Sequence, residues 1–232
     1  MPPTVAEGAR FQFASDQSLL VSFGAKITRP AHELVLKLLR LLESEHVPGI
    51  RNLHPAYCSL LVKFDPLRLR HADLQAMLEQ YLSRLEKVAL PKPRLVEIPV
   101  CYGGEYGPDL LEVSALHKLA PKQVIELHSS ATYLVYFLGF VPGFAYLGEL
   151  PDGLITPRLP TPRRKVPAGS VAIAGNQTGV YPVVTPGGWR LLGRTPLAMF
   201  RPDRHGLSLL TIGDQVRFVP ISAQQFAALE RA

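Results

Sequence analysis

The segment from Ala174 to Pro196 constrains the fold more than any other part of the chain. It reads AGNQTGVYPVVTPGGWRLLGRTP and holds five glycines, three prolines and the chain's only tryptophan, but no acidic residue. Its glycines and prolines disfavour a helix, and it is too apolar for a linker. Short β-prone pieces lie in and around it, separated by turn signals: SVAIAG, VYPVV, WRLLG, LSLL and QVRFVPI. Their spacing of roughly 8–12 residues predicts a β-barrel or a compact sandwich.

Residues 10–90 have a different pattern, typical of a small α+β unit. RFQFASDQSLLVSFG alternates in polarity and predicts a two-stranded hairpin. Apolar residues recur at helical spacing over 31–45 and 74–85, which predicts two amphipathic helices. IRNLHPAYCSLLVKFDP predicts a strand pair or one bent strand, and 94–100 a further strand. This order suits an antiparallel sheet covered by two helices.

The segment ALPKPRL, residues 89–95, is the expected domain boundary because its prolines stiffen a short connector. We therefore expect an α+β domain over 1–90 and a mainly-β domain over 91–232. Within the second domain, Asp109 is placed to begin a helix and APKQVIELHSS (120–130) predicts another. TYLVYFLGF (132–140) is nearly continuous in β-prone residues and predicts a buried strand.

Composition narrows the class of protein. The chain has 232 residues, 47% hydrophobic and 19% charged, which is typical of a globular protein. It has no apolar run of about eighteen residues, and its start, MPPTVAEGAR, lacks the pattern of a secretory signal. We therefore expect a cytoplasmic protein without a membrane span. Cys58 and Cys101 are expected to be buried free thiols, with a disulfide or a catalytic cysteine as the alternative.

The charge distribution indicates what the protein binds. The net charge is +6, but the basic residues are scattered, with PRRK (162–165) as the one cluster, which argues against a nucleic-acid partner. Residues 139–196 hold six Lys or Arg against two acidic residues, so much of the excess lies in this region. A solvated basic rim or a site for a small anion fits this better. No sequence pattern for a metal, a standard phosphate loop or a nucleophile elbow is present, so we expect no metal site.

Three titratable residues are candidates for catalysis. Glu105 and Asp109 lie four residues apart in a glycine-rich loop, YGGEYGPD, and can supply a general base and an orienting partner. The alternative is a capped helix entrance, with Asp109 as the cap and Glu105 in solvent. His128 is at the end of a predicted helix. It is either a catalyst or, more commonly for a lone histidine, a structural hydrogen-bonding residue.

The candidates for substrate binding lie in the basic, glycine-rich half. Arg158 and Arg163 each follow a proline, which suits contact with a carboxylate or phosphate, and structural salt bridges explain the pair equally well. The aromatic loop FVPGFAY (140–146) is a pocket wall or corner packing. The other candidates are Gln177, Tyr181, Gly187, Gly188, Trp189 and Arg194. The glycines either expose backbone N–H groups to a ligand or form turns. Together these residues predict a rigid, basic, aromatic site for a small polar molecule.

The same segments carry a family resemblance. YGGEYGPDL, YLVYFLGFVPGFAYL, VPAGSVAIAG, QTGVYP and TPGGWRLLGRTP occur in this order, and the chain resembles the PxpB/KipI family, also called allophanate hydrolase subunit 1. The resemblance covers nearly all of 95–220 and the earlier part more loosely. It implies a ferredoxin-like N-terminal domain and a cyclophilin-like β-barrel C-terminal domain.

The resemblance also implies a function and partners. It implies a subunit of 5-oxoprolinase, which opens 5-oxo-L-proline to L-glutamate with ATP hydrolysis, inactive without a homologous barrel subunit (PxpC) and a third subunit (PxpA). In the KipI branch it implies instead a binding module that inhibits a sensor histidine kinase.

In the enzyme, Arg158 and Arg163 are expected to bind anionic groups. Tyr181, Gln177 and the glycine pair 187–188 would hold the amide or carboxylate of the substrate, and one of the three titratable candidates would act as the base or orient it. Because the standard phosphate loop is missing, ATP binding must be non-standard, shared between subunits or carried by another subunit.

Overall fold

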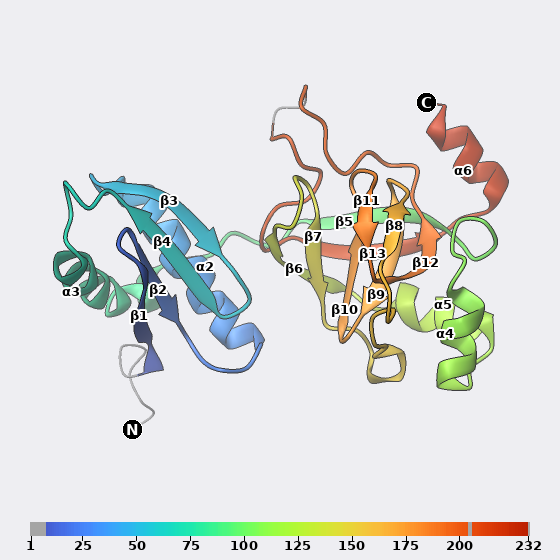
Figure 1. Ribbon diagram of the computed structural model, residues 1–232, viewed down its shortest axis with the longest axis horizontal. Helices are drawn as coiled ribbons and strands as arrows, with labels where there is room; N and C mark the ends of the chain where they lie inside the picture. The colour runs from blue at the N-terminus through green and yellow to red at the C-terminus, as the bar shows by residue number, and fades with distance from the viewer. Residues whose placement is uncertain (1–7, 204–205, 232) are drawn as a thin grey trace. The chain divides into compact units, whose positions relative to one another are not determined.

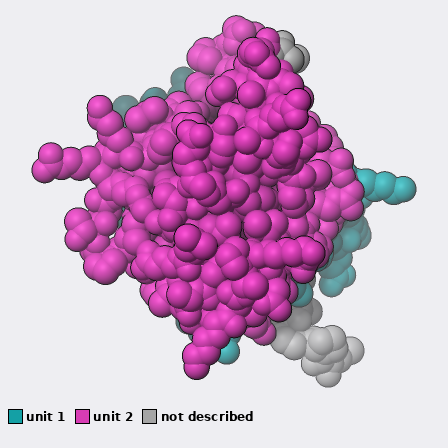
Figure 2. All heavy atoms as spheres, turned by 90° about the vertical axis from the view of Figure 1, so that its right-hand side faces the viewer, with its two compact units in different colours: residues 1–92 teal, residues 93–232 magenta. Residues whose placement is uncertain are grey.

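The computed structural model describes residues 8–203 and 206–231. The chain divides into two compact units, residues 1–92 and 93–232, which are coloured separately in Figure 2. Each unit has its own buried apolar core. Among the described residues, no helix is both long and apolar enough to cross a membrane.

The first unit is a four-stranded antiparallel sheet with helices, as the alternation and helical spacing predict (Figure 1). The strand order is β1-β2-β4-β3. Its strands are β1 (Arg10–Ser15), β2 (Ser18–Ser22), β3 (Ile50–Pro55) and β4 (Ser59–Phe64); its helices are α2 (Arg29–Glu45), α3 (His71–Leu82) and the short 3₁₀ turn η1 (Leu85–Lys87). The segment IRNLHPAYCSLLVKFDP thus forms a strand pair, one of the two expected alternatives.

Helix α2 shows why this sequence begins and ends a helix where it does. The Thr28 side chain accepts a hydrogen bond from the Ala31 N–H, and Pro30 occupies the first turn, where a missing N–H costs nothing. The helix ends at His46, whose left-handed φ of 46° breaks the helical path. Val35 and Leu38 are fully buried on the face that packs against the sheet, so the helix is stabilised mainly by its apolar face.

The order of elements in this unit differs from a ferredoxin-like chain, which runs β-α-β-β-α-β. Strands β2 and β3 flank β4 and are both antiparallel to it, so β2, α2 and β3 form a split β-α-β unit. The edge position next to β2 is held by β1, which precedes it in the chain rather than following α3. The ferredoxin-like domain therefore stays a prediction.

The second unit is a closed barrel of seven strands, in the order β10-β7-β6-β13-β5-β12-β9 (Figure 1). The expected mainly-β barrel is confirmed, and the strand expected over 94–100 belongs to it rather than to the antiparallel sheet of the first unit, with which it was grouped. Its strands are β5 (Leu95–Tyr102), β6 (Tyr133–Leu138), β7 (Ala145–Gly148), β9 (Ser170–Ala174), β10 (Gln177–Val180), β12 (Arg190–Arg194) and β13 (Gln215–Pro220). The barrel is mixed: β5 and β13 pair in parallel, and the other neighbours are antiparallel. The barrel closes because the two strands at the ends of this order, β10 and β9, also pair with each other, so the sheet has no open edge.

Smaller elements surround the barrel. They are the ribbon of β8 (Arg163–Val166) and β11 (Thr185–Gly187), helices α4 (Leu110–His117), α5 (Pro121–Ser130) and α6 (Ala223–Glu230), and the 3₁₀ turn η2 (Asp152–Leu154). Two of the β-prone pieces are not strands as expected. Only the first residue of VYPVV belongs to β10, and LSLL contributes a single bridge between Ser208 and Phe200. In VYPVV the reason is Pro182, which cannot donate to a sheet ladder.

Candidate functional site

A pocket of about 240 Å³ opens on the barrel unit and gathers much of the predicted site. Its lining residues are Phe140, Phe144, Tyr146, Arg158, Pro162, Tyr181, Pro186, Gly187, Gly188 and Trp189. They come from the aromatic segment 140–146, which runs into β7, from the segment between η2 and β8, and from the glycine-rich segment between β10 and β12. Of the residues proposed from sequence for substrate binding, the pocket brings together Arg158, Tyr181, Gly187, Gly188 and Trp189.

Aromatic rings packed edge to face form the wall of the pocket. The ring centre of Phe144 lies 5.3 Å from that of Tyr181 and 5.4 Å from that of Trp189. Tyr146 completes the wall, 4.9 Å from Phe144 and 6.0 Å from Trp189. Each such pair contributes about 0.5–1.5 kcal/mol beyond its buried area. The wall is therefore held in place without a ligand.

Arg158 supplies the only positive charge among the described lining residues. Its guanidinium carbon lies 6.0 Å from the centre of the Trp189 ring, within range of cation–π attraction. Burial raises the pKa of Tyr146 and Tyr181, and the charge of Arg158 opposes that rise at both hydroxyls. The pocket thus combines flat apolar faces with one guanidinium. This combination suits a small, flat anion.

The structure gives Gly187 a specific reason to be glycine. A Cβ at this position would collide with the hydroxyl and ring of Tyr181. Hydrogen bonding to the Trp189 backbone also lowers the pKa of that hydroxyl, against the larger effect of burial. At Gly188, by contrast, a Cβ would meet Pro162 at 3.6 Å, an ordinary van der Waals contact. Gly187 therefore lets β11 pass closely over Tyr181.

Asp109 and Arg163 form an ion pair next to the pocket. Asp109 is only 4% exposed and occupies the N-cap position of α4, as the cap alternative expected, but its side chain makes no capping hydrogen bond there. Its Oδ1 accepts from Arg163 Nη2 at 2.5 Å, and its Oδ2 from the Leu191 N–H at 2.7 Å. The charge of Arg163 reaches the pocket, since it helps to lower the pKa of Tyr181 against the larger effect of burial. Both carboxylate oxygens of Asp109 are thus engaged by protein groups.

His128 lies inside the barrel unit, fully buried near the end of α5. Its Nδ1 is 2.8 Å from the Tyr102 hydroxyl and its Nε2 is 2.9 Å from Thr178 Oγ1. Its ring stacks on Phe218 with 4.6 Å between ring centres. Burial lowers the pKa of His128 to about 3. It is therefore neutral at physiological pH, and it is not among the residues that line the pocket.

The remaining predicted residues also lie outside the pocket lining. Glu105 is exposed in the loop after β5. Gln177 begins β10, opposite Ala174 of β9. Arg194 Nε donates to the Ala168 carbonyl at 3.2 Å. Within the part of the chain that the structure describes, no cluster of three His, Cys, Asp or Glu side chains is placed to hold a metal ion.

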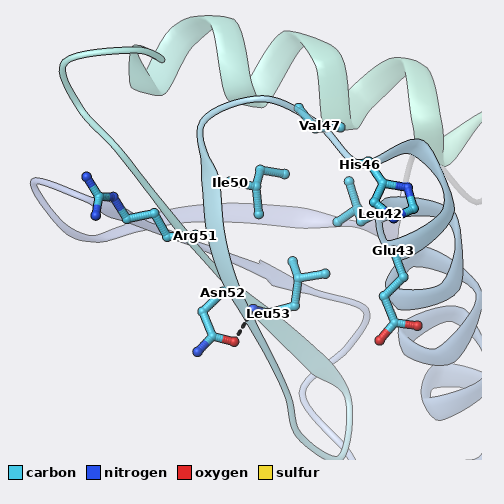
Figure 3. Close-up of a pocket in the computed structure, with 8 residues that line it drawn as sticks. All are labelled: Leu42, Glu43, His46, Val47, Ile50, Arg51, Asn52 and Leu53. Carbon is cyan, nitrogen blue, oxygen red and sulfur yellow. Dashed lines mark hydrogen bonds between the residues drawn. The ribbon is translucent and has the colours of Figure 1, made fainter.

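The first unit has a larger pocket, of about 440 Å³, between the end of α2 and β3 (Figure 3). Leu42, Val47 and Ile50 provide apolar lining, while the Arg51 side chain points away from them in Figure 3. The Asn52 side-chain oxygen accepts from the adjacent backbone N–H of Leu53 at 2.8 Å. None of the residues proposed from sequence for substrate binding is among the described residues that line this pocket, whereas five of them line the pocket of about 240 Å³ in the barrel unit, which is therefore the candidate site.

Sequence comparison shows the family of this chain. The model of the family described as "Carboxyltransferase domain, subdomain C and D" matches residues 9–210. The chain is 41% identical over 223 residues to the B subunit of 5-oxoprolinase from Bacillus subtilis (strain 168), covering 92% of this chain and 93% of that protein. The chain belongs to the PxpB family of 5-oxoprolinase subunits. A second PxpB protein, from Escherichia coli O157:H7, is 43% identical over 217 residues, covering 91% and 96% of the two chains.

Two solved structures share the architecture of this PxpB family member. TTHA0988 is 39% identical with a TM-score of 0.79, over 89% of this chain and 40% of that chain. The urea carboxylase of Kluyveromyces lactis is 19% identical with a TM-score of 0.78, over 98% of this chain and 23% of that chain, which shows a shared fold alone. The chain thus spans less than half the length of either protein. In both, the matching part is one portion of a longer polypeptide.

Proposed function

We propose that this chain is a subunit of an ATP-dependent 5-oxoprolinase, which opens 5-oxo-L-proline to L-glutamate together with PxpC-like and PxpA-like subunits. The names of the two relatives, at 41% and 43% identity over nearly the full chain, support this role. Both names describe one subunit of an enzyme, which supports a complex with further subunits. Because ATP is the co-substrate, we expect the complex in the cytoplasm.

The observation that carries the proposal is the match between the barrel pocket and this substrate. 5-Oxoproline is a small, nearly flat lactam ring with one carboxylate. The side chains of Tyr146 and Trp189 line the pocket and offer apolar contact to the ring, and the guanidinium of Arg158 is a suitable partner for the carboxylate. A volume of about 240 Å³ suits a ligand of this size better than a whole nucleotide.

The chemistry explains why partner subunits are needed. A lactam is stabilised by resonance, so its opening is assisted by transfer of the ATP γ-phosphoryl group to the carbonyl oxygen, which releases ADP. Water then adds to the activated carbon, the ring C–N bond breaks and the nitrogen takes a proton, which gives γ-glutamyl phosphate. A second water hydrolyses this acyl phosphate to L-glutamate and phosphate. The water needs a general base, yet none of the described lining residues carries a carboxylate or an imidazole. We therefore assign the base and most of the ATP contacts to the partner subunits.

Binding to the isolated chain tests the pocket. Trp189 is the chain's only tryptophan and lines the pocket, so its fluorescence reports on a ligand there. We expect saturable change with 5-oxo-L-proline and none with 2-pyrrolidinone, the same ring without a carboxylate. Arg158→Gln should weaken binding about 10- to 100-fold, as expected for losing a charged hydrogen bond. Arg164→Gln, at an exposed position of β8, is the matched control and should bind normally.

Activity tests the role as a subunit. The full mixture with PxpA-like and PxpC-like subunits should hydrolyse ATP only when 5-oxoproline is present, and omission of this chain should abolish that dependence. A complete mixture without 5-oxoproline-dependent hydrolysis would refute the proposal. Neither relative named above is described as a kinase inhibitor, so inhibition of a histidine kinase stays a prediction.

A further inference from the structure

The backbone on both sides of Arg158 is tied to residues 188–190, the short segment at the start of β12 that contains Trp189. On the C-terminal side, the Leu159 N–H donates to the Gly188 carbonyl at 2.8 Å. On the N-terminal side, Arg190 Nε donates to the Pro157 carbonyl at 3.1 Å. Arg158 is therefore held between two contacts to the same short segment, 188–190. The second contact is made by a side chain, so a substitution can remove it.

Arg190 is an unusual residue for a barrel strand, since its side chain is only 7% exposed. Burial of a guanidinium is costly unless the charge is paired. The pairing comes from α4, where Glu112 Oε1 lies 2.6 Å from Arg190 Nη1. The Nη1 atom of the guanidinium is paired with the Glu112 carboxylate by charge, without the geometry of a hydrogen bond, while Nε donates to the Pro157 carbonyl. The ion pair compensates the buried charge and keeps the guanidinium near α4.

The contact at Pro157 has a direct effect on the next residue. Proline has a fixed φ and no N–H, so its carbonyl is its one main-chain hydrogen-bonding group. When that carbonyl is held, the peptide plane between Pro157 and Arg158 is held with it. Together with the Leu159 backbone contact, Arg190 then holds the direction in which Arg158 leaves the backbone, toward the Trp189 ring.

We infer that Arg190, paired with Glu112, is a positioning residue that aims Arg158 into the barrel pocket and so sets the affinity for the anionic group of the ligand. The inference rests on the proposed function of the pocket, and it identifies the contacts of Arg190 that prepare Arg158 to bind an anion. Preorganisation of this kind improves affinity because less order must be created on binding.

The first test measures affinity for 5-oxo-L-proline by Trp189 fluorescence. Arg190→Gln should weaken binding about tenfold, within the range of coupling between contacting residues. Glu112→Gln, at a half-exposed residue, should weaken it less and in the same direction. In an Arg158→Gln background, Arg190→Gln should cause no further loss, because it acts through Arg158. Binding equal to wild type in folded Arg190→Gln, or full additivity of the two losses, would overturn the inference.

A second measurement separates this inference from the proposed function. Acrylamide quenching of Trp189 needs no ligand, and we expect it to rise in Arg158→Gln and to a similar value in Arg190→Gln. If the wild-type chain does not bind 5-oxoproline but quenching rises in both variants, the proposed ligand is wrong and the positioning role stands. If quenching is unchanged in Arg190→Gln, the positioning role is wrong. Should Arg190→Gln fail to fold, Arg190→Lys and Glu112→Gln take its place in both measurements.

Discussion

Buried His128 should make the barrel unit sensitive to mild acid. Thr178 Oγ1 donates its hydrogen to the Ala172 carbonyl at 3.0 Å, so at the imidazole it accepts, and Nε2 is the donor. Nδ1 then accepts from the Tyr102 hydroxyl. Both ring nitrogens are satisfied by the neutral imidazole, and a second proton on Nδ1 would oppose the Tyr102 donor. Burial disfavours the charged form further and lowers the pKa of His128 to about 3.

The sign and size of the effect follow from linkage. The ordinary pKa of histidine is 6.5, so below this pH the unfolded chain binds a proton at His128 that the folded barrel does not bind. Stability contributed by this residue is complete well above pH 6.5 and is lost as the pH falls toward 3. At 1.36 kcal/mol per pH unit, about 2 kcal/mol should be lost between pH 8 and pH 5.

Urea unfolding at pH 8, 7, 6 and 5, followed by Trp189 fluorescence, measures this in the barrel unit alone, since the chain has no other tryptophan. His128→Gln is less stable at every pH, but its loss between pH 8 and pH 5 should be about 2 kcal/mol smaller than that of wild type. Val135→Ala is the control: it removes buried apolar volume and should keep the wild-type pH dependence. Parallel pH profiles for wild type and His128→Gln would refute the reasoning.

Two further predictions concern neighbours of the pocket. Asp109→Asn should destabilise the barrel by about 3 kcal/mol, because it leaves the partly buried Arg163 without its carboxylate, whereas Glu105→Gln at an exposed site should cost less than about 0.5 kcal/mol. The urea unfolding midpoints of the two variants measure this difference, and equal midpoints would contradict the ion-pair argument. Gly187→Ala should cost about 1–3 kcal/mol by overpacking, while Gly188→Ala should be neutral or slightly stabilising; a cost at Gly188 equal to that at Gly187 would show that the tyrosine contact is not the cause.

The elements that the sequence predicted well are those whose pattern is local. Helix α2 has apolar residues at helical spacing, a threonine cap and a proline in its first turn, so its start and its buried face were both predictable. The β1–β2 hairpin followed from alternation and a short turn. The parallel pairing of β5 with β13 was not predictable in the same way, since Gln215 pairs with Leu95, far away in the chain. Barrel closure depends on that contact, and a local pattern carries no information about it.

At the candidate site too, the sequence predicted what its local pattern shows, the types of residue, and missed what depends on their positions in the fold. Arg158, Tyr181 and Trp189 were chosen as a cation and two aromatic residues near glycines, and they do meet in one pocket. Arg190 was missed as a site residue because a single arginine in a predicted strand is normally interpreted as a charge on the surface. Only its 7% exposure and its contact to the Pro157 carbonyl reveal a buried role. Its place directly after Trp189 was the one local signal.

Two of the three groups chosen from sequence for catalysis, Asp109 and His128, differ in a physical way from those that line the pocket, and the third, Glu105, is exposed outside the pocket lining. Both carboxylate oxygens of Asp109 accept hydrogen bonds from protein donors. Both ring nitrogens of His128 are hydrogen-bonded to neighbouring side chains inside the barrel unit. A general base must be within about 3 Å of the water that it activates, directly or through one further water. Groups that are buried and already bonded do not meet that requirement without rearrangement. The pocket residues instead offer recognition: flat faces and one guanidinium. The division of labour that we propose follows from this contrast, with this chain binding the lactam and a partner subunit supplying the base.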